Sequence, residues 1–175
     1  MSQTSKAPSP WVERFASLIP KGGIVLDLAC GSGRHTRYLS AMGYRLLAVD
    51  IDVARVEDLS KNESVEIMKA DLEAGDWPFS ERQFDGIVVT NYLHRPHLQR
   101  LVESLAPGGV LIYETFAKGN EKLGQPRNPA FLLNPAELLD AFAPRLTIMA
   151  YEHAIEDEPT PAVRQRICAV NASEP

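Results

Sequence analysis

Apolar residues occur along the chain in short runs that alternate with stretches of helical periodicity. The run 24–28 is apolar except for Asp27, and such a run is typical of a parallel strand that is covered on both faces. His35, Leu39 and Met42 follow at spacings of four and three residues, which predicts a helix directly after this strand. A strand that leads straight into a helix favours an α/β fold.

The alternation continues to the end of the chain and indicates one mostly parallel sheet. Further strands are expected at 46–49, 65–69, 84–89, 110–114, 146–151 and 163–170. Helices are expected from Pro10, over 52–59, over 98–105 and from Asn134. The last two strands are expected to pair antiparallel across a loop rich in Glu, Asp and Pro. The predicted fold class is therefore α/β, with three layers (α/β/α) around a seven-stranded sheet that ends in an antiparallel hairpin.

Length and composition fit one enzyme domain. With 175 residues, 45% of them apolar, the chain can bury a core of its own, so residues 10–175 are expected to form a single domain. Residues 1–9 are polar, lack an apolar signal core and are expected to form a flexible tail. No apolar run approaches the length that spans a membrane, so no membrane partner is expected.

Charge and cysteine content argue against several other functions. A net charge of −5 disfavours general nucleic-acid binding, which requires a basic surface. The spacing of the two cysteines, Cys30 and Cys168, fits neither a metal site nor a redox pair. A reducing, cytoplasmic location without a bound metal is therefore expected. The sequence leaves open whether the protein is a monomer or a dimer.

The junction between the first strand and its helix has the composition of a site for a nucleotide-like ligand. Gly31 and Gly33 let the backbone turn sharply and approach a ligand. Asp50 ends the second strand, where an acidic side chain can bond ribose hydroxyls. A dinucleotide site usually has a third glycine, and this chain has Thr36 there. Asp27 would repel phosphates, whereas its carboxylate suits the ammonium and sulfonium groups of S-adenosylmethionine.

The turn and the two aspartates resemble the class I S-adenosylmethionine-dependent methyltransferases, and further motifs follow in that family's order. These are Ala70-Asp71-Leu72, Trp77-Pro78-Phe79, the run 84–89 and the run 105–110. The resemblance covers residues 11–170, with Ala29 in place of the first glycine of many members. It implies a Rossmann-like fold, with S-adenosylmethionine as methyl donor and S-adenosylhomocysteine as product. The cofactor contacts that it implies are Asp27, Ala29, Cys30, Gly31, Gly33, Asp50, Ile51, Asp71, Leu72 and Asn91.

The methyl acceptor is expected after the fourth and fifth strands, whose carboxyl ends face the ligand crevice in such sheets. Tyr92, His94 and Glu114 are the candidates there for catalysis. Methyl transfer from a sulfonium requires mainly orientation, and a base is needed only where the acceptor must lose a proton. In amino-group methyltransferases this place can hold an Asn/Asp-Pro-Pro-aromatic tetrad. Only Asn91 matches it, which disfavours a nucleobase or glutamine nitrogen as acceptor.

The segment 114–133 has no clear strand or helix period and is longer than most connections, so it is expected to be a lid or a binding loop. It resembles a bacterial group of small stand-alone methyltransferases described as like tellurite-resistance enzymes. Its basic and amide side chains lie beside Phe116 in the sequence, which suggests a small anionic or polar acceptor against an aromatic wall. The candidate acceptor contacts are Arg34, Arg95, Phe116 and Arg127.

Four functional hypotheses follow from these residues. The leading one is an S-adenosylmethionine-dependent methyltransferase that acts on a small molecule. Almost the whole chain is needed for the core fold, which leaves no added domain to bind a macromolecule. Methylation of RNA or protein is the alternative within that class. A cofactor-binding module without catalysis is an alternative from another class, although the intact glycines and aspartates argue against a decayed site. A nicotinamide-dependent oxidoreductase would need a phosphate site that the sequence does not provide.

Overall fold

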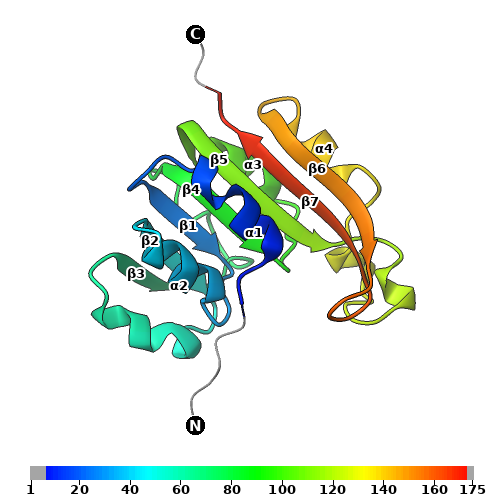
Figure 1. Ribbon diagram of the computed structural model, residues 1–175, viewed down its shortest axis with the longest axis horizontal. Coiled ribbons are helices and arrows are strands. Elements are labelled where there is room, and N and C mark those ends of the chain that lie inside the picture. Colours follow the sequence, from blue (N-terminus) through cyan, green and yellow to red (C-terminus); the bar gives the residue numbers. More distant parts are fainter. Residues whose placement is uncertain (1–6, 173–175) are drawn as a thin grey trace.

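The computed structural model describes residues 7–172, which contain one seven-stranded sheet (Figure 1). Its strands are β1 (Ile24–Leu28), β2 (Arg45–Asp50), β3 (Val65–Lys69), β4 (Phe84–Thr90), β5 (Leu105–Phe116), β6 (Thr147–Glu156) and β7 (Ala162–Val170). They lie in the order β3-β2-β1-β4-β5-β7-β6. The first five are parallel, and β7 pairs antiparallel with both β5 and β6. The predicted fold class is confirmed.

The strand order reverses between β1 and β4, and this reversal opens the ligand crevice. From β1 the chain moves outward through β2 to β3, and it then returns to place β4 on the other side of β1. The connections after β1 and β4 therefore leave the sheet in opposite directions at their carboxyl ends. In open α/β sheets, ligands bind at such a switch point.

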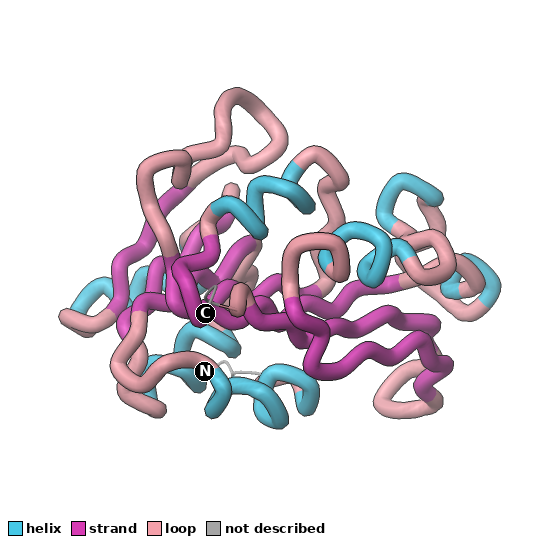
Figure 2. Tube along the Cα trace, turned by 90° about the horizontal axis from the view of Figure 1, so that it is seen from above, coloured by secondary structure: helices cyan, strands magenta, loops and turns pink. Residues whose placement is uncertain are grey.

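Helices cover both faces of the sheet (Figure 2). They are α1 (Pro10–Phe15), α2 (Arg34–Ala41), α3 (His97–Glu103) and α4 (Glu137–Phe142), with the 3-10 helices η1 (Ala16–Leu18), η2 (Ala54–Lys61), η3 (Asn120–Lys122) and η4 (Pro129–Phe131). Apolar side chains of α1 and α2 pack on one face of the sheet, and those of α3 and α4 pack on the other. None of the helices within residues 7–172 has the length and apolar character that crossing a membrane requires.

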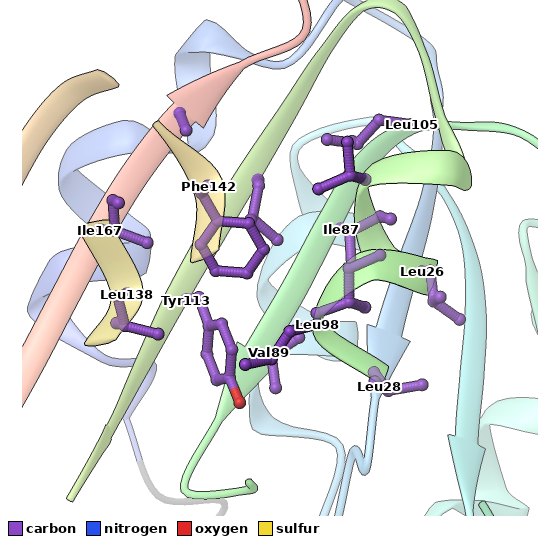
Figure 3. Close-up of a cluster of buried hydrophobic side chains, with 14 of the residues drawn as sticks. Leu26, Leu28, Ile87, Val89, Leu98, Leu105, Tyr113, Leu138, Phe142 and Ile167 are labelled. Atoms are coloured by element: carbon purple, nitrogen blue, oxygen red, sulfur yellow. The ribbon is translucent and has the colours of Figure 1, made fainter. Parts of the chain in front are cut away.

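Tyr113 of β5 belongs to the core beneath α3 and α4 and connects that core to the backbone after β4. Its ring lies beside Phe142 of α4, with ring centroids 6.1 Å apart (Figure 3). The Tyr113 side chain is buried, and its hydroxyl donates to the carbonyl of Tyr92 at 2.8 Å. Because a buried hydroxyl needs a hydrogen-bond partner, this contact fixes the backbone directly after β4.

Element boundaries differ from the expectations in several places. The strand expected at 146–151 continues to Glu156, and the helix expected over 98–105 ends at Glu103. The strand expected at 110–114 begins at Leu105, and the helix expected over 52–59 is the 3-10 helix η2. The helix expected from Asn134 begins at Glu137, after Ala136 in the left-handed region at φ 60°. A carboxylate oxygen of Glu137 accepts from the Asn134 backbone N–H at 2.7 Å, which is the bond that a glutamate in the first turn of a helix returns to a capping residue.

Residues 7–9 of the tail expected at 1–9 pack against the fold, and residues 1–6 lie outside the described part. Ser9 is 3% exposed, and its hydroxyl accepts from the Trp11 backbone N–H at the start of α1. The Ser9 backbone N–H donates to the Nε2 atom of His35 at 3.1 Å. Burial lowers the pKa of His35 to about 4. This imidazole is thus a neutral core side chain in α2.

Candidate functional site

The glycine turn between β1 and α2 has three residues in the left-handed region. Ala29, Gly31 and Gly33 have φ values of 54°, 56° and 72°. A Cβ at Gly31 would meet nothing within 4 Å, so this residue faces open space. A Cβ at Gly33 would come within 2.5 Å of Val56 Cγ1, so that glycine is required for packing against η2.

Asp50, at the end of β2, holds the turn in place. One carboxylate oxygen accepts from the Gly31 backbone N–H at 2.8 Å, and the other accepts from the Asp52 backbone N–H at 3.0 Å. Each carboxylate oxygen has two lone pairs, so both can accept a further hydrogen bond. Asp50 can therefore bind a ligand hydroxyl while it fixes the glycine turn.

Asp27 lies behind the turn as a buried carboxyl group. It is 2% exposed, and the Thr36 hydroxyl donates to it at 2.6 Å. Burial raises the pKa of Asp27 to about 6, and the Thr36 hydrogen bond opposes that rise. Thr36, which occupies the third-glycine position, thus supports Asp27 from α2. An acidic group that is costly to bury and is placed beside a ligand turn is a candidate for function.

A first cavity of about 450 Å³ lies at the carboxyl ends of β1, β2 and β3. Its walls are Ala29, Asp50, Ile51, Ala70, Asp71, Leu72, Glu73, Ala74 and Tyr92. Five of the ten expected cofactor contacts are among them, namely Ala29, Asp50, Ile51, Asp71 and Leu72. Of the other five, Asn91 lines a second cavity, while Asp27, Cys30, Gly31 and Gly33 form the turn and its support.

The second cavity, of about 460 Å³, adjoins the first. Its walls are Glu73, Asn91, Tyr92, Leu93, Thr115, Phe116, Gln125, Pro126 and Phe131. Glu73 and Tyr92 line both cavities and therefore lie where the two meet. Glu73 is not among the site residues expected from the sequence, although its position two residues after Asp71 is a signal that could have pointed to it.

Tyr92 has an unusual hydroxyl group at this junction. Its oxygen is buried and has no hydrogen-bond partner among residues 7–172. Burial, followed by the negative charges of Glu73, Asp71 and Asp50, raises the pKa of Tyr92. The phenol therefore stays protonated near neutral pH. A buried hydroxyl without a partner is costly, and a ligand atom in either cavity could satisfy it.

The segment 114–133 begins with the last residues of β5, and the rest of it forms a loop whose two ends are joined. The Leu133 backbone N–H donates to the Phe116 carbonyl at 3.0 Å, and the Lys118 backbone N–H donates to the Leu133 carbonyl at 2.9 Å. Inside the loop, the Asn120 side-chain amide donates to the Pro126 carbonyl at 3.1 Å. The loop supplies Gln125, Pro126 and Phe131 to the second cavity. The loop therefore forms part of the wall of this cavity.

Arg95 does not line either cavity but fastens this loop. Its guanidinium donates to both carboxylate oxygens of Glu137, at 2.6 and 2.9 Å. It also donates to the carbonyls of Ala130 at 3.0 Å and Leu132 at 2.9 Å, on either side of Phe131. These contacts give Arg95 a structural role in holding the loop.

The other basic side chains expected at the acceptor are also absent from the cavity walls. Arg127, Lys118 and Lys122 are exposed and do not line the second cavity. Arg34 donates to the Ala7 carbonyl at 3.2 Å. Of the four candidate acceptor contacts, Phe116 alone lines that cavity.

Two of the three candidate catalytic residues lie outside both cavities. Glu114 is 4% exposed, and Arg166 donates to its carboxylate at 2.8 Å. The His94 ring lies beside that of His97, with ring centroids 4.5 Å apart and the ring planes tilted by 56°. Tyr92 is therefore the candidate that the structure places between the cavities.

Known proteins resemble this chain in sequence and in structure. Residues 25–109 match a family described as a methyltransferase domain. A demethylmenaquinone methyltransferase of Clavibacter sepedonicus is 31% identical over 105 residues, covering 55% of this chain and 42% of that protein. A protein-L-isoaspartate O-methyltransferase of Chlorobium phaeobacteroides is 34% identical over 106 residues, covering 58% of this chain and 48% of that protein. The chain thus matches less than half the length of these relatives.

Two solved structures share the fold over 97% of this chain. TehB from Haemophilus influenzae has a TM-score of 0.80 at 21% identity, with 64% of that chain covered. A Burkholderia thailandensis 1,6-didemethyltoxoflavin-N1-methyltransferase, solved with 1,6-didemethyltoxoflavin and S-adenosylhomocysteine, has a TM-score of 0.72 at 18% identity, with 80% of that chain covered.

Proposed function

We propose that this chain methylates a small molecule held in the second cavity, because residues 25–109 match the methyltransferase domain family and the fold is that of the class I S-adenosylmethionine-dependent methyltransferases. One observation carries the proposal: two cavities adjoin at the switch point of the sheet and share Glu73 and Tyr92. The first would hold the methyl donor and the second the acceptor.

The residues of the first cavity fit S-adenosylmethionine. Gly31 faces open space and so leaves room for a ligand beside the turn. The free lone pairs of Asp50 suit ribose hydroxyls, and Leu72 and Ile51 offer apolar contacts to a base. When bound, the sulfonium supplies an electrophilic methyl group, and its sulfur keeps the electron pair of the broken bond as a thioether.

The residues around the second cavity would orient the acceptor and exclude water. Tyr113 fixes the backbone of Tyr92, and Arg95 fixes the loop that carries Phe131. The protonated Tyr92 hydroxyl can donate a hydrogen bond at the junction, but it cannot act as a base at neutral pH. Alignment of reactants is enough to lower a barrier by several kcal/mol.

The size of the second cavity supports a small acceptor. A volume of about 460 Å³ is within the range of small-molecule sites, and the 114–133 loop walls it on one side. The Burkholderia thailandensis enzyme, whose structure holds a small molecule, shares the fold. Two curated relatives are protein methyltransferases by name, so a protein acceptor is the alternative.

Methyl incorporation from labelled S-adenosylmethionine tests the proposal. The protein is incubated with cell extract that has been separated into a small-molecule fraction and a macromolecular fraction. We expect label in the small-molecule fraction. Label confined to protein or RNA would refute the small-molecule acceptor, and binding of S-adenosylhomocysteine without transfer to either fraction would favour a catalytically silent module.

A further inference from the structure

We propose that the second cavity selects acceptors whose apolar body carries a positively charged nitrogen, with the Glu73 carboxylate as the partner of that charge. The inference rests on the proposed function, because it names the acceptor class of the same site. It departs from the anionic acceptor that the basic residues of the 114–133 segment suggested.

The walls of the second cavity are mostly apolar and carry one ionisable acidic group. Leu93, Phe116, Pro126 and Phe131 provide apolar surface, and Asn91, Thr115 and Gln125 provide neutral polar groups. Among the residues that the structure describes, Glu73 is the carboxylate in this lining, which contains no Lys, Arg or His side chain. An acceptor with an apolar body would therefore meet complementary walls, and the charge available to it is negative.

Two arginines that lie near these walls, Arg95 and Arg164, are already paired within the protein. Arg95 is bound by Glu137 in the bidentate contact described above. Arg164 lies over the Phe116 ring at 4.2 Å, and its guanidinium pairs with Glu156 at 3.1 Å and donates to the Asn91 side-chain oxygen. Neither guanidinium lines the cavity, and each has an acidic partner that largely offsets its charge.

Acidic side chains make the electrostatic potential negative where the two cavities meet. Asp50, Asp71 and Glu73 line the first cavity, and all three act on the Tyr92 hydroxyl to disfavour its negative form. A bound S-adenosylmethionine, with one net positive charge, would balance part of this potential. An acceptor with a carboxylate would meet like charge at Glu73, whereas an ammonium group would meet opposite charge.

Three aromatic probes of similar shape test this preference: 2-phenylethylammonium, 2-phenylethanol and 3-phenylpropanoate. Each is titrated calorimetrically into protein saturated with S-adenosylhomocysteine, so that no turnover occurs. We expect the ammonium to bind best and the carboxylate worst. Because Glu73 is exposed, its contribution to ammonium binding should be about two- to fivefold in affinity at low salt, and it should shrink at high salt.

Glu73→Gln keeps the shape of the side chain and removes its charge. We expect this variant to lose the preference for the ammonium over the alcohol, with alcohol binding unchanged. Asp76→Asn is the matched control, because Asp76 is an exposed acid of the same loop that lines neither cavity. This control should bind all three probes like the wild type.

Tighter binding of the carboxylate, an ammonium preference that survives in Glu73→Gln, or no binding of any probe at millimolar concentration would overturn the inference. These outcomes are separate from failure of the proposed function. If S-adenosylhomocysteine binds but the probes do not follow the expected order, the acceptor class is wrong and the cofactor assignment stands. If S-adenosylhomocysteine itself does not bind, the proposed function fails.

Discussion

Replacing Asp27 by Asn should stabilise the protein at neutral pH and weaken its binding of cofactor. Asp27 is buried, and its pKa is raised from 3.8 to about 6, chiefly by burial. The folded state therefore binds this proton more tightly than the unfolded state does. The stabilising contribution of the group is complete below pH 3.8 and is lost as the pH rises through 6.

The size of the effect follows from the pKa shift. Two pKa units correspond to about 3 kcal/mol of stability lost at pH 7. Asn has no charge to bury, and its side-chain oxygen can still accept from the Thr36 hydroxyl. A hydrogen bond to a neutral oxygen is weaker, which offsets about 1 kcal/mol. Asp27→Asn should therefore be more stable than the wild type by about 2 kcal/mol at pH 7, or roughly 4–8 °C in Tm.

A group that lowers stability at the working pH is expected where function requires it. A cationic group of the cofactor near Asp27 would stabilise the carboxylate, in addition to the neighbouring Arg34 and against the neighbouring Asp50. We therefore expect the affinity of the wild type for S-adenosylhomocysteine to fall as the pH drops through 6. In Asp27→Asn the affinity should be lower at pH 7 and should not show this dependence.

The assay is urea unfolding of the wild type, Asp27→Asn and Thr36→Val at pH 7 and near pH 4, with calorimetric titration of S-adenosylhomocysteine. His35, with a pKa of about 4, titrates in all three proteins, so its effect cancels in the differences. Thr36→Val removes the donor to the carboxylate and should destabilise at pH 7. The reasoning is refuted if Asp27→Asn is less stable at pH 7, if its gain persists near pH 4, or if it binds cofactor like the wild type.

Two further substitutions test the architecture around the site. Arg95→Ala removes the bonds to Glu137 and to the carbonyls beside Phe131, so we expect a loss of about 1–2 kcal/mol in urea unfolding and faster amide exchange around Phe131. Unchanged exchange there would contradict the fastening role. Gly33→Ala places a Cβ 2.5 Å from Val56 at a φ of +72°, and we expect it to destabilise by about 2 kcal/mol or more. A wild-type unfolding midpoint would show that the turn relaxes more freely than its packing suggests.

The fold could be predicted because parallel strands that are buried on both faces appear in the sequence as short continuous apolar runs. The apolar runs of β1 and β2 are covered on both faces, and the polar residues that end them, such as Asp50, face the crevice. The first and last residues of the strands were harder to predict from the sequence. β5 begins several residues earlier than its apolar run because its first part pairs with β4 at Phe84.

The residues around the second cavity were harder to predict, because long charged side chains form ion pairs with residues that are far away in the sequence. Arg95 binds Glu137 and Arg166 binds Glu114, and neither pairing can be read from local spacing. Both residues of the first pair sit among ordinary surface charges in the sequence. Glu73 is a site candidate that the sequence does not reveal. An exposed carboxylate in a loop is usually a solvated charge, and only the structure shows that Glu73 lines both cavities.

Calorimetric titration with S-adenosylhomocysteine tests the central claim most directly, because it reports on the first cavity alone. The wild type should bind at one site with micromolar affinity. Asp50→Ala should weaken binding roughly tenfold or more, since it removes a charged hydrogen-bond acceptor, while Asp52→Asn, outside both cavity walls, should not. No heat and no thermal shift with the wild type, or equal affinity in Asp50→Ala, would contradict the assignment of this cavity to the methyl donor.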